Sequence, residues 1–342
     1  MSRPGPDPTN RAKSLRTNRV KSLGTNRVKS LSVAAACLAL IVIVVGAYVR
    51  LSDAGLGCPD WPLCYGRPLP AEIADGAAHA KAWKEMGHRY IAGGLGVLIL
   101  LLFISAWKLR KSHALATAIL AVVVLQATLG MWTVTMLLKP AIVTAHLLGG
   151  VATFALLLWL ALSQYAHAFS QETKTIRVPA ALALAVVAIQ IALGGWVSAN
   201  YAALACPDLP GCRGQFFPPM DFANAFHVLR ELGRTGEGGL LPLEALVAIH
   251  WTHRMFALVV LGIAGYAAFR SFRVPALRKI GVAVAGLLVL QVSLGIANVA
   301  FSLPLALAAA HNAGAALLLA SLVVLNFFVF HGVHPRGLPP SL

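Results

Sequence analysis

The stretch 114–137 reads ALATAILAVVVLQATLGMWTVTML, an apolar run without a single charged residue. A helix needs about 20 such residues to cross the hydrocarbon core of a bilayer, so this run predicts a transmembrane helix. Seven other runs of similar length accompany it, and the eight predicted spans are 33–52, 85–107, 114–137, 141–164, 178–199, 245–269, 279–301 and 304–330. The sequence therefore predicts an all-α polytopic membrane protein.

The composition of the whole chain agrees with this prediction. Of the 342 residues, 58% are hydrophobic and 12% are charged, and the mean hydropathy is +0.75. Soluble globular domains carry about 25% charged residues, so this composition excludes an ordinary soluble enzyme and a disordered chain. The formal net charge is nevertheless +16, which in a soluble protein would suggest a nucleic-acid partner.

The basic residues fall mainly on one side of the predicted membrane. Eighteen Lys and Arg residues, with two acids, lie before the first span, after spans two, four and six, and in the C-terminal tail. The opposite loops and helix mouths hold seven basic and ten acidic residues. The positive-inside rule therefore predicts that both termini are cytoplasmic, and we expect no nucleic-acid partner.

The N-terminal segment 1–32 is separate and basic, and one motif occurs in it three times. Residues 9–15, 17–23 and 25–31 read TNRAKSL, TNRVKSL and TNRVKSL. We interpret residues 1–32 as a disordered cytoplasmic tail beside anionic lipid. A mitochondrial transit peptide, which is also Arg-rich and acid-poor, and a nucleic-acid contact are the alternatives.

A longer repeat relates the two parts of the chain. The segment LQATLG at 125–130 returns as LQVSLG at 290–295, so the residue numbers differ by a constant offset of 165. Four histidines keep the same offset in two pairs, and they are His88 with His253 and His146 with His311. The offset predicts two tandem four-helix bundles of the same orientation, related by a parallel pseudo-two-fold axis. The N-terminal half is 33–165 and the C-terminal half is 178–330.

The four histidines lie near the starts of spans that run in one direction, so we expect them at similar depth near the outer face. Within each half, two imidazoles then project from two different helices of a bundle. Such a pair suits axial ligation of a haem iron. Each histidine taken alone is open to a simpler interpretation as a packed or interfacial residue. Zinc is disfavoured, because no His, Cys, Asp and Glu residues share zinc-site spacing.

Three further polar residues accompany the histidines. Glu85 lies three residues before His88 on the same helical face, and its counterpart in the second half is His250. A carboxylate in a membrane helix is costly and often functional, although a helix N-terminus lowers that cost. Arg89 and Arg254 are candidates for pairing with haem propionates, with a lipid-phosphate contact as the alternative.

Four of the five cysteines form two pairs in the outer loops. Cys58 and Cys64, like Cys206 and Cys212, have five residues between them, and the two pairs are related by an offset of 148. An oxidising outer compartment makes both disulfides plausible, either as loop staples or as redox-active pairs. Cys37 lies within the first span and is interpreted as a small core residue.

The loop motif and the histidines together resemble the haem A synthase family. The segment Arg50-Leu51-Ser52, followed by GLGCPDWPLCYG at 55–66, carries the resemblance. Further matching segments are Glu85-Met86-Gly87-His88-Arg89, Thr144-Ala145-His146, His253-Arg254 and His311. The resemblance covers roughly residues 33–330, leaving out the repetitive tail.

This resemblance implies oxidation of a haem O methyl group to the formyl group of haem A, in cytochrome oxidase assembly. Two hydroxylations would give a gem-diol, which loses water. By the same resemblance, His88 and His146, with Arg89, bind the substrate haem, and His253 and His311, with Arg254, bind a resident haem b. Glu85 would aid oxidation or proton handling.

Two other functions remain open at this point. A di-haem electron-transfer protein of the cytochrome b type would explain the histidines, and a transporter built from parallel repeats would explain the repeat. For the synthase we expect haem O from a haem O synthase, an electron donor or acceptor and membrane lipid as partners. A homo-oligomer is left open. The expected location is the bacterial cytoplasmic membrane, with the mitochondrial inner membrane as the alternative.

Overall fold

The structure of the protein is a computed structural model that describes residues 8–70, 75–165 and 171–332. Eight long helices make up most of it, and they are α1 (Pro8–Leu51), α2 (Gly76–Lys108), α3 (His113–Thr135), α4 (Pro140–Leu162), α5 (Arg177–Ala199), α7 (Leu243–Phe272), α8 (Arg278–Ala300) and α9 (Leu305–His331). The short elements are η1 (Gln171–Ile176), η2 (Ala202–Leu204) and α6 (Phe222–Ala225). All eight predicted spans are confirmed as helices long and apolar enough to cross a membrane.

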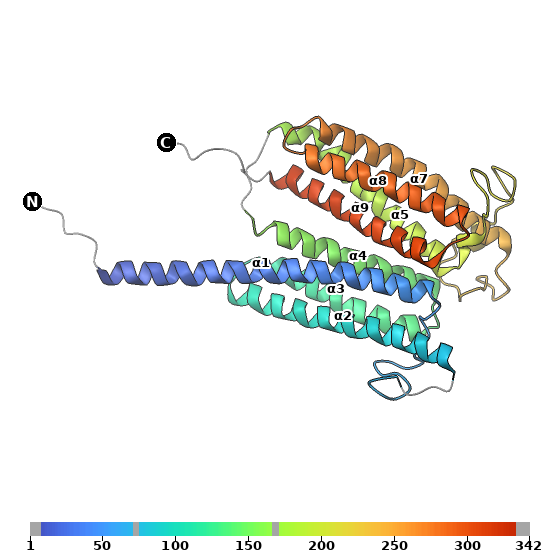
Figure 1. Ribbon diagram of the computed structural model, residues 1–342, viewed down its shortest axis with the longest axis horizontal. Helices are drawn as coiled ribbons and strands as arrows, with labels where there is room; N and C mark the ends of the chain where they lie inside the picture. The colour runs from blue at the N-terminus through green and yellow to red at the C-terminus, as the bar shows by residue number, and fades with distance from the viewer. Residues whose placement is uncertain (1–7, 71–74, 166–170, 333–342) are drawn as a thin grey trace, which may run out of the picture.

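The long helices form two groups of four (Figure 1). Helices α1 to α4 pack together as one group, and α5, α7, α8 and α9 pack together as the other. The groups meet where α4 contacts α5 and α9, and where α1 contacts α9. The two cysteine loops, 52–70 and 200–242, lie at one end of the bundle, which we call the loop end. The start of α1 and the end of α9 lie at the other end, the terminal end.

Two of the short turns between helices have the same backbone. Leu137 and Leu138, between α3 and α4, are both left-handed, with φ of 49° and 57°. Ser302 and Leu303, between α8 and α9, are left-handed with φ of 55° and 64°, at the positions that the offset of 165 relates to the first turn. Pro140 then begins α4, because proline has no backbone N–H to leave unpaired at a helix start. The sequence repeat is therefore matched by local structure.

The cysteine loops also share one local structure. Both predicted disulfides are confirmed, Cys58–Cys64 and Cys206–Cys212. The carboxylate of Asp60 accepts backbone N–H groups of Tyr65 and Gly66, at 2.6 and 2.8 Å. The carboxylate of Asp208 accepts the equivalent groups of Arg213 and Gly214 in the second loop. Each loop is thus closed by one disulfide and one aspartate.

The outer surface of the helix bundle is apolar, unlike the surface of a soluble protein. Small and aliphatic side chains fill the interior of each half. Large apolar side chains also face outward, among them Val97, Val124, Leu258 and Val289, each at least 60% exposed. An exposed apolar surface on fully hydrogen-bonded helices suits a hydrocarbon solvent. The chain is a multi-pass membrane protein.

Two expectations about the first helix are wrong. The repeats at 9–31 are not a disordered tail, because α1 begins at Pro8 and continues through them without a break. This segment has no proline after Pro8 and is rich in Leu, Lys and Arg, which are good helix formers. Cys37 is exposed on α1 rather than part of the core.

Candidate functional site

A cavity of about 420 Å³ lies among the helices of the N-terminal half, and Gly55 and Trp61 of the first cysteine loop are part of its lining. Its volume is in the range of pockets that enclose a large organic ligand. Helices α1 to α4 supply most of its lining, and α5 and α9 add Gly195, Ser198 and Asn312 from the other half. His88 and His146 both line it, so the structure brings together the first predicted histidine pair.

The second histidine pair is also brought together. His253 on α7 and His311 on α9 lie close enough to interact electrostatically. The side-chain amide of Gln190 donates to the backbone oxygen of His253 at 3.0 Å, and that of Gln291 does the same for His311 at 3.0 Å. Both amide nitrogens also lie within 3.5 Å of the imidazole Nε2 atoms.

Each of the four imidazoles rests against a glycine of a neighbouring helix. A Cβ added to that glycine would lie 2.8 to 3.2 Å from the imidazole Cε1 atom, and the pairs are Gly46 with His88, Gly130 with His146, Gly194 with His253, and Gly295 with His311. Real Cβ atoms are essentially never found closer than 3.0 Å to such a neighbour, and rarely closer than 3.4 Å. The absence of a side chain at each glycine therefore gives the imidazole the space that it occupies. Sequence reasoning missed this role, although Gly130 and Gly295 end the repeated LQ motif.

The imidazoles also share an unpartnered atom. The Nδ1 atoms of His88, His146, His253 and His311 are buried, and none has a hydrogen-bond partner in the described part of the chain. A buried ring nitrogen without a partner is costly unless something else completes its contacts. Two pairs of such rings on facing helices fit axial ligation of a haem iron in each half.

Glu85 is buried in the lining of the cavity, with 4% of its surface exposed. One carboxylate oxygen accepts the backbone N–H of Cys58 at 2.8 Å, and the other is ion-paired with Arg89. Arg89 also donates to the backbone oxygens of Asp60 and Leu63, at 2.9 and 2.7 Å. The first disulfide loop, the arginine and the acid are therefore one connected unit.

The equivalent unit of the C-terminal half has a different composition. Arg254 donates to the backbone oxygens of Asp208 and Gly211, both at 2.8 Å, and to that of Cys206. Where Arg89 has Glu85, Arg254 instead donates to Nε2 of the buried His250 at 3.1 Å. Both arginines thus hold their cysteine loops, so a haem propionate would have to share the guanidinium with the loop.

Two more polar residues of the cavity were not predicted as site residues. Arg50 on α1 donates to the backbone oxygen of Ser198 at 2.7 Å and stacks 3.9 Å from the ring centre of Tyr201, yet its Nε is buried without a partner. Both side-chain polar atoms of Gln126 are likewise buried and unpartnered. The recurrence of Gln126 as Gln291 in the LQ motif was the available signal.

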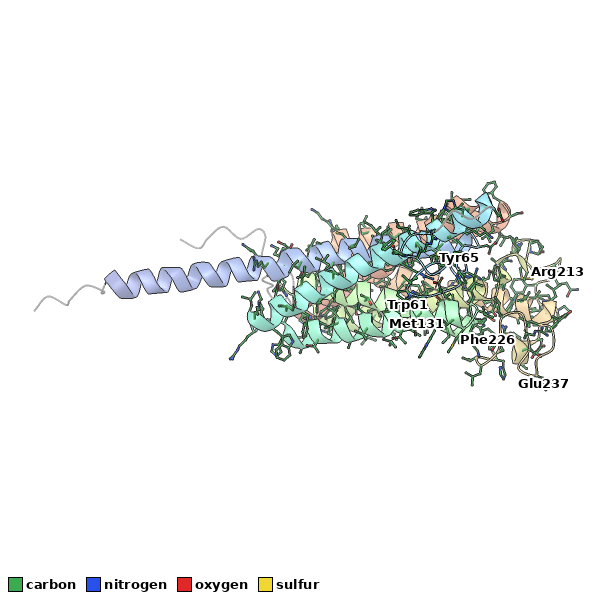
Figure 2. All side chains as sticks on the ribbon, turned by 90° about the horizontal axis from the view of Figure 1, so that it is seen from below. Trp61, Tyr65, Met131, Arg213, Phe226 and Glu237 are labelled. Carbon is green, nitrogen blue, oxygen red and sulfur yellow. A yellow bond between two sulfur atoms is a disulfide. The ribbon has the colours of Figure 1, made fainter. Side chains whose placement is uncertain are left out.

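The second cysteine loop extends beyond the helix ends. Figure 2 shows its residues Arg213, Phe226 and Glu237 at the far end of the molecule from the start of α1, while Trp61 of the first loop lies closer to the helices. Trp61 lines the cavity. Glu231 of the second loop forms an ion pair of 2.9 Å with Lys139, at the start of α4, so this loop also contacts the N-terminal half.

Comparison with known proteins places these features in one family. Residues 29–323 match the family model described as "Cytochrome oxidase assembly protein". A "Heme A synthase" of Shewanella oneidensis is 43% identical over 309 residues, which cover 85% of this chain and 93% of that protein. Proteins of the same name from Caulobacter sp. and Rhizorhabdus wittichii are 30% and 28% identical, each over 84% of this chain and at least 90% of their own length.

Proposed function

The chain belongs to the haem A synthase family, and we propose that its two halves divide the work, with substrate oxidised in the N-terminal half and a haem b held in the C-terminal half. The protein is an oxidoreductase of cytochrome oxidase assembly that converts haem O to haem A. The proposal concerns which residues do this and where.

The N-terminal cavity is the proposed substrate site. The observation that carries this proposal is the convergence of His88, His146 and the buried Glu85 on one cavity of about 420 Å³. The two imidazoles would hold the substrate iron, and Gln126 would contact the substrate through its unpartnered amide. The guanidinium of Arg50, with its buried unpartnered Nε, suits a propionate.

Glu85 is the proposed proton acceptor. Oxidation of a methyl carbon to a formyl carbon removes four electrons and releases protons, so the site needs a group that can carry a proton. Among the described residues that line the cavity, Glu85 is the one carboxylate. The N–H of Cys58 and the guanidinium of Arg89 hold its two oxygens in place.

The C-terminal half is the proposed site of haem b, ligated by His253 and His311. A haem with two imidazole ligands supplies one-electron transfer. Helix α9 supports communication between the sites, because His311 lies in the C-terminal half while the next residue, Asn312, lines the N-terminal cavity. The redox partner outside this chain would be an electron donor or acceptor.

The proposed arrangement in the membrane follows the charges. Lys108, Arg177 and Arg278 lie at helix ends on the terminal side, so this side would face the cytoplasm of a bacterium. The loop end would then face an oxidising compartment, where two disulfides persist. The matching turns and cysteine loops support a pseudo-two-fold relation between the halves, with its axis along the membrane normal.

The experiment that tests this function uses cells that make haem O and lack any other haem A synthase. Expression of the full chain should give haem A, identified by mass after extraction. Expression of the Glu85→Gln variant should give the same amount of protein, with its haem b, and little haem A. Haem O unchanged by the wild-type protein would instead favour the di-haem electron-transfer function.

A further inference from the structure

The cavity continues from the histidines toward the terminal end as an apolar arm. The residues at its inner end are Ala39 on α1, Leu95 and Gly96 on α2, Val123 on α3 and Thr153 on α4. Ala39 lies seven residues before Gly46 and Val123 seven residues before Gly130, the glycines that contact His88 and His146. Thr153 lies seven residues after His146. Two helical turns correspond to about 11 Å. The arm therefore reaches about two turns below the imidazoles.

The arm has almost no polar character. Four of these five residues are apolar, and the hydroxyl of Thr153 donates to the backbone oxygen of Gly149 in its own helix, at 2.8 Å. A Cβ added to Gly96 would meet no atom within 4 Å, so the wall at this glycine is open. An occupant of the arm would gain apolar contact and no hydrogen bond.

The C-terminal half has different residues at the positions equivalent to the arm. The offsets of 148 for the first helix of each half and 165 for the others identify the equivalent positions, and their residues are Val187, Val260, Leu261, Leu288 and Leu318. All of these except Leu261 belong to the buried core of the C-terminal half. Only at the pair Leu95 and Val260 does the N-terminal half have the larger side chain. The N-terminal half thus has the smaller residue at four of these five pairs of positions, which leaves more space among its helices at this depth than larger side chains would.

We propose that the apolar arm binds the isoprenoid side chain of haem O. This inference rests on the proposed function, because it assumes that the macrocycle lies between His88 and His146. Haem O differs from haem b by a long farnesyl-derived chain on its macrocycle, and a chain of that kind needs an apolar slot. The arm begins at the level of the imidazoles and leads away from the loop end, so the chain would extend into the membrane-spanning part of the protein.

This assignment gives the arm a role in selecting the substrate. Haem b lacks the chain and would leave the arm empty, while haem O would bury its chain against Ala39, Val123 and Thr153. The larger side chains at four of the five equivalent positions of the C-terminal half would leave less room for the same chain, so haem O would be directed to the N-terminal half and haem b retained in the other.

The test fills the arm with the residues of the C-terminal half. The variants are Val123→Leu, Thr153→Leu and the two combined, in the purified full-length protein. Val124→Leu is the matched control, because it makes the same chemical change one residue away, at a position that is 60% exposed and does not line the cavity. Size-exclusion profile and thermal midpoint report whether each variant folds, and the single substitutions serve if the double variant does not.

The readouts are the KM for haem O and the binding of added haem b as a probe without the chain. We expect the double variant to raise the KM for haem O at least about tenfold, since extra methylenes in a filled apolar pocket have effects of that size. Binding of added haem b should change less than about twofold, because the macrocycle site is unaltered. An unchanged KM for haem O would overturn the proposal, as would an equal loss of haem O and haem b.

Failure of the proposed function has a different result. In that case the wild-type protein itself would make no haem A, whatever the arm contains. If the arm instead holds an acyl chain of a membrane lipid, the double variant would lose co-purifying lipid and keep the wild-type KM for haem O, which would also overturn the proposal.

Discussion

The two halves of this protein use one scaffold for two different sites. Both have a cysteine loop held by an arginine, a pair of imidazoles and a glycine against each ring. They differ in the residue beside the arginine, which is Glu85 in one half and His250 in the other. They differ also in the space below the imidazoles. Under the proposed function, the two halves would hold their haems with the same geometry, and these few positions would determine which half oxidises its haem.

Histidine substitutions should give the largest difference between the two halves in haem content and haem A production. His253→Ala should remove the haem b absorbance and, with it, haem A production. His88→Ala should keep the haem b absorbance and lower haem A production by more than about 100-fold, because loss of a direct ligand exceeds the effect of losing an outer contact. Absorbance spectra and extracted haems measure both effects. Loss of the same spectrum in both variants would contradict two separate sites.

Glu85→Gln tests the acid that distinguishes the halves. The amide keeps the size of the carboxylate but cannot carry the proton, so haem A formation should fall about 100-fold. The haem b spectrum should stay at its wild-type intensity. Glu244→Gln, an exposed acid in the first turn of α7, is the control and should behave as wild type. Full activity of Glu85→Gln would reduce Glu85 to a structural partner of Arg89.

The two disulfides should differ in what their loss affects. Replacing Cys58 and Cys64 by serine frees the loop whose backbone N–H holds Glu85, so conversion should fall between about ten- and a hundredfold. Replacing Cys206 and Cys212 should leave conversion within about threefold of wild type. Either pair should cost about 2 kcal/mol of unfolding free energy, measured by thermal or denaturant unfolding. If the two replacements lowered conversion equally, the hydrogen bond from Cys58 to Glu85 would not explain the effect of the first disulfide.

The glycines beside the imidazoles allow a smaller comparison. Gly46→Ala would place a Cβ 2.8 Å from His88 Cε1, while Gly194→Ala would place one 3.1 Å from His253 Cε1. Both should destabilise the protein, by about 1–3 kcal/mol. Gly46→Ala should lower conversion with an unchanged haem b spectrum, and Gly194→Ala should shift that spectrum. Gly262→Ala on α7 is the control, since its Cβ would meet nothing within 4 Å.

The aspartates that close the cysteine loops should have the smallest effect. The backbone N–H of Gly214, with that of Arg213, lowers the pKa of Asp208 below its ordinary value of 3.8. Because the pKa is lower in the folded state, the ionised carboxylate stabilises the loop when the pH is above the ordinary pKa. This stabilisation is lost as the pH falls through the folded-state pKa. Amide exchange of Gly214 should therefore rise below about pH 4, and Asp208→Asn should abolish this pH dependence. Unchanged exchange in acid would show that the disulfide alone closes the loop.

Much of the fold was predictable because each membrane-spanning helix is determined by its own stretch of sequence. A span must satisfy its own backbone hydrogen bonds and present apolar side chains, so hydropathy alone located all eight helices. The two constant offsets of the internal repeat are matched in the structure by equivalent turns and equivalent cysteine loops. The extension of α1 to Pro8 was missed, because the basic repeats were interpreted by charge while their helix propensity was overlooked.

The site was predictable only in part. The two disulfides were predicted correctly from residue type and spacing, and the four histidines and Glu85 were proposed as site residues on the same grounds. The roles of Arg89 and Arg254 in holding the loops were not, because their acceptors are backbone oxygens that any sequence supplies. No motif could predict that the Nε of Arg50 and the side-chain amide of Gln126 are buried without hydrogen-bond partners, because this depends on how the surrounding side chains pack.

The sequence by itself determined the number of spans, the internal repeat and the positions of the ionisable residues, since these follow from composition and periodicity along one chain. Only the tertiary structure decided which glycine contacts which imidazole, that Glu85 accepts the backbone N–H of Cys58, and that a cavity extends below His88 and His146. Those outcomes depend on side-chain volume where four helices meet, and residues such as Ala39 and Thr153 are far apart in the sequence.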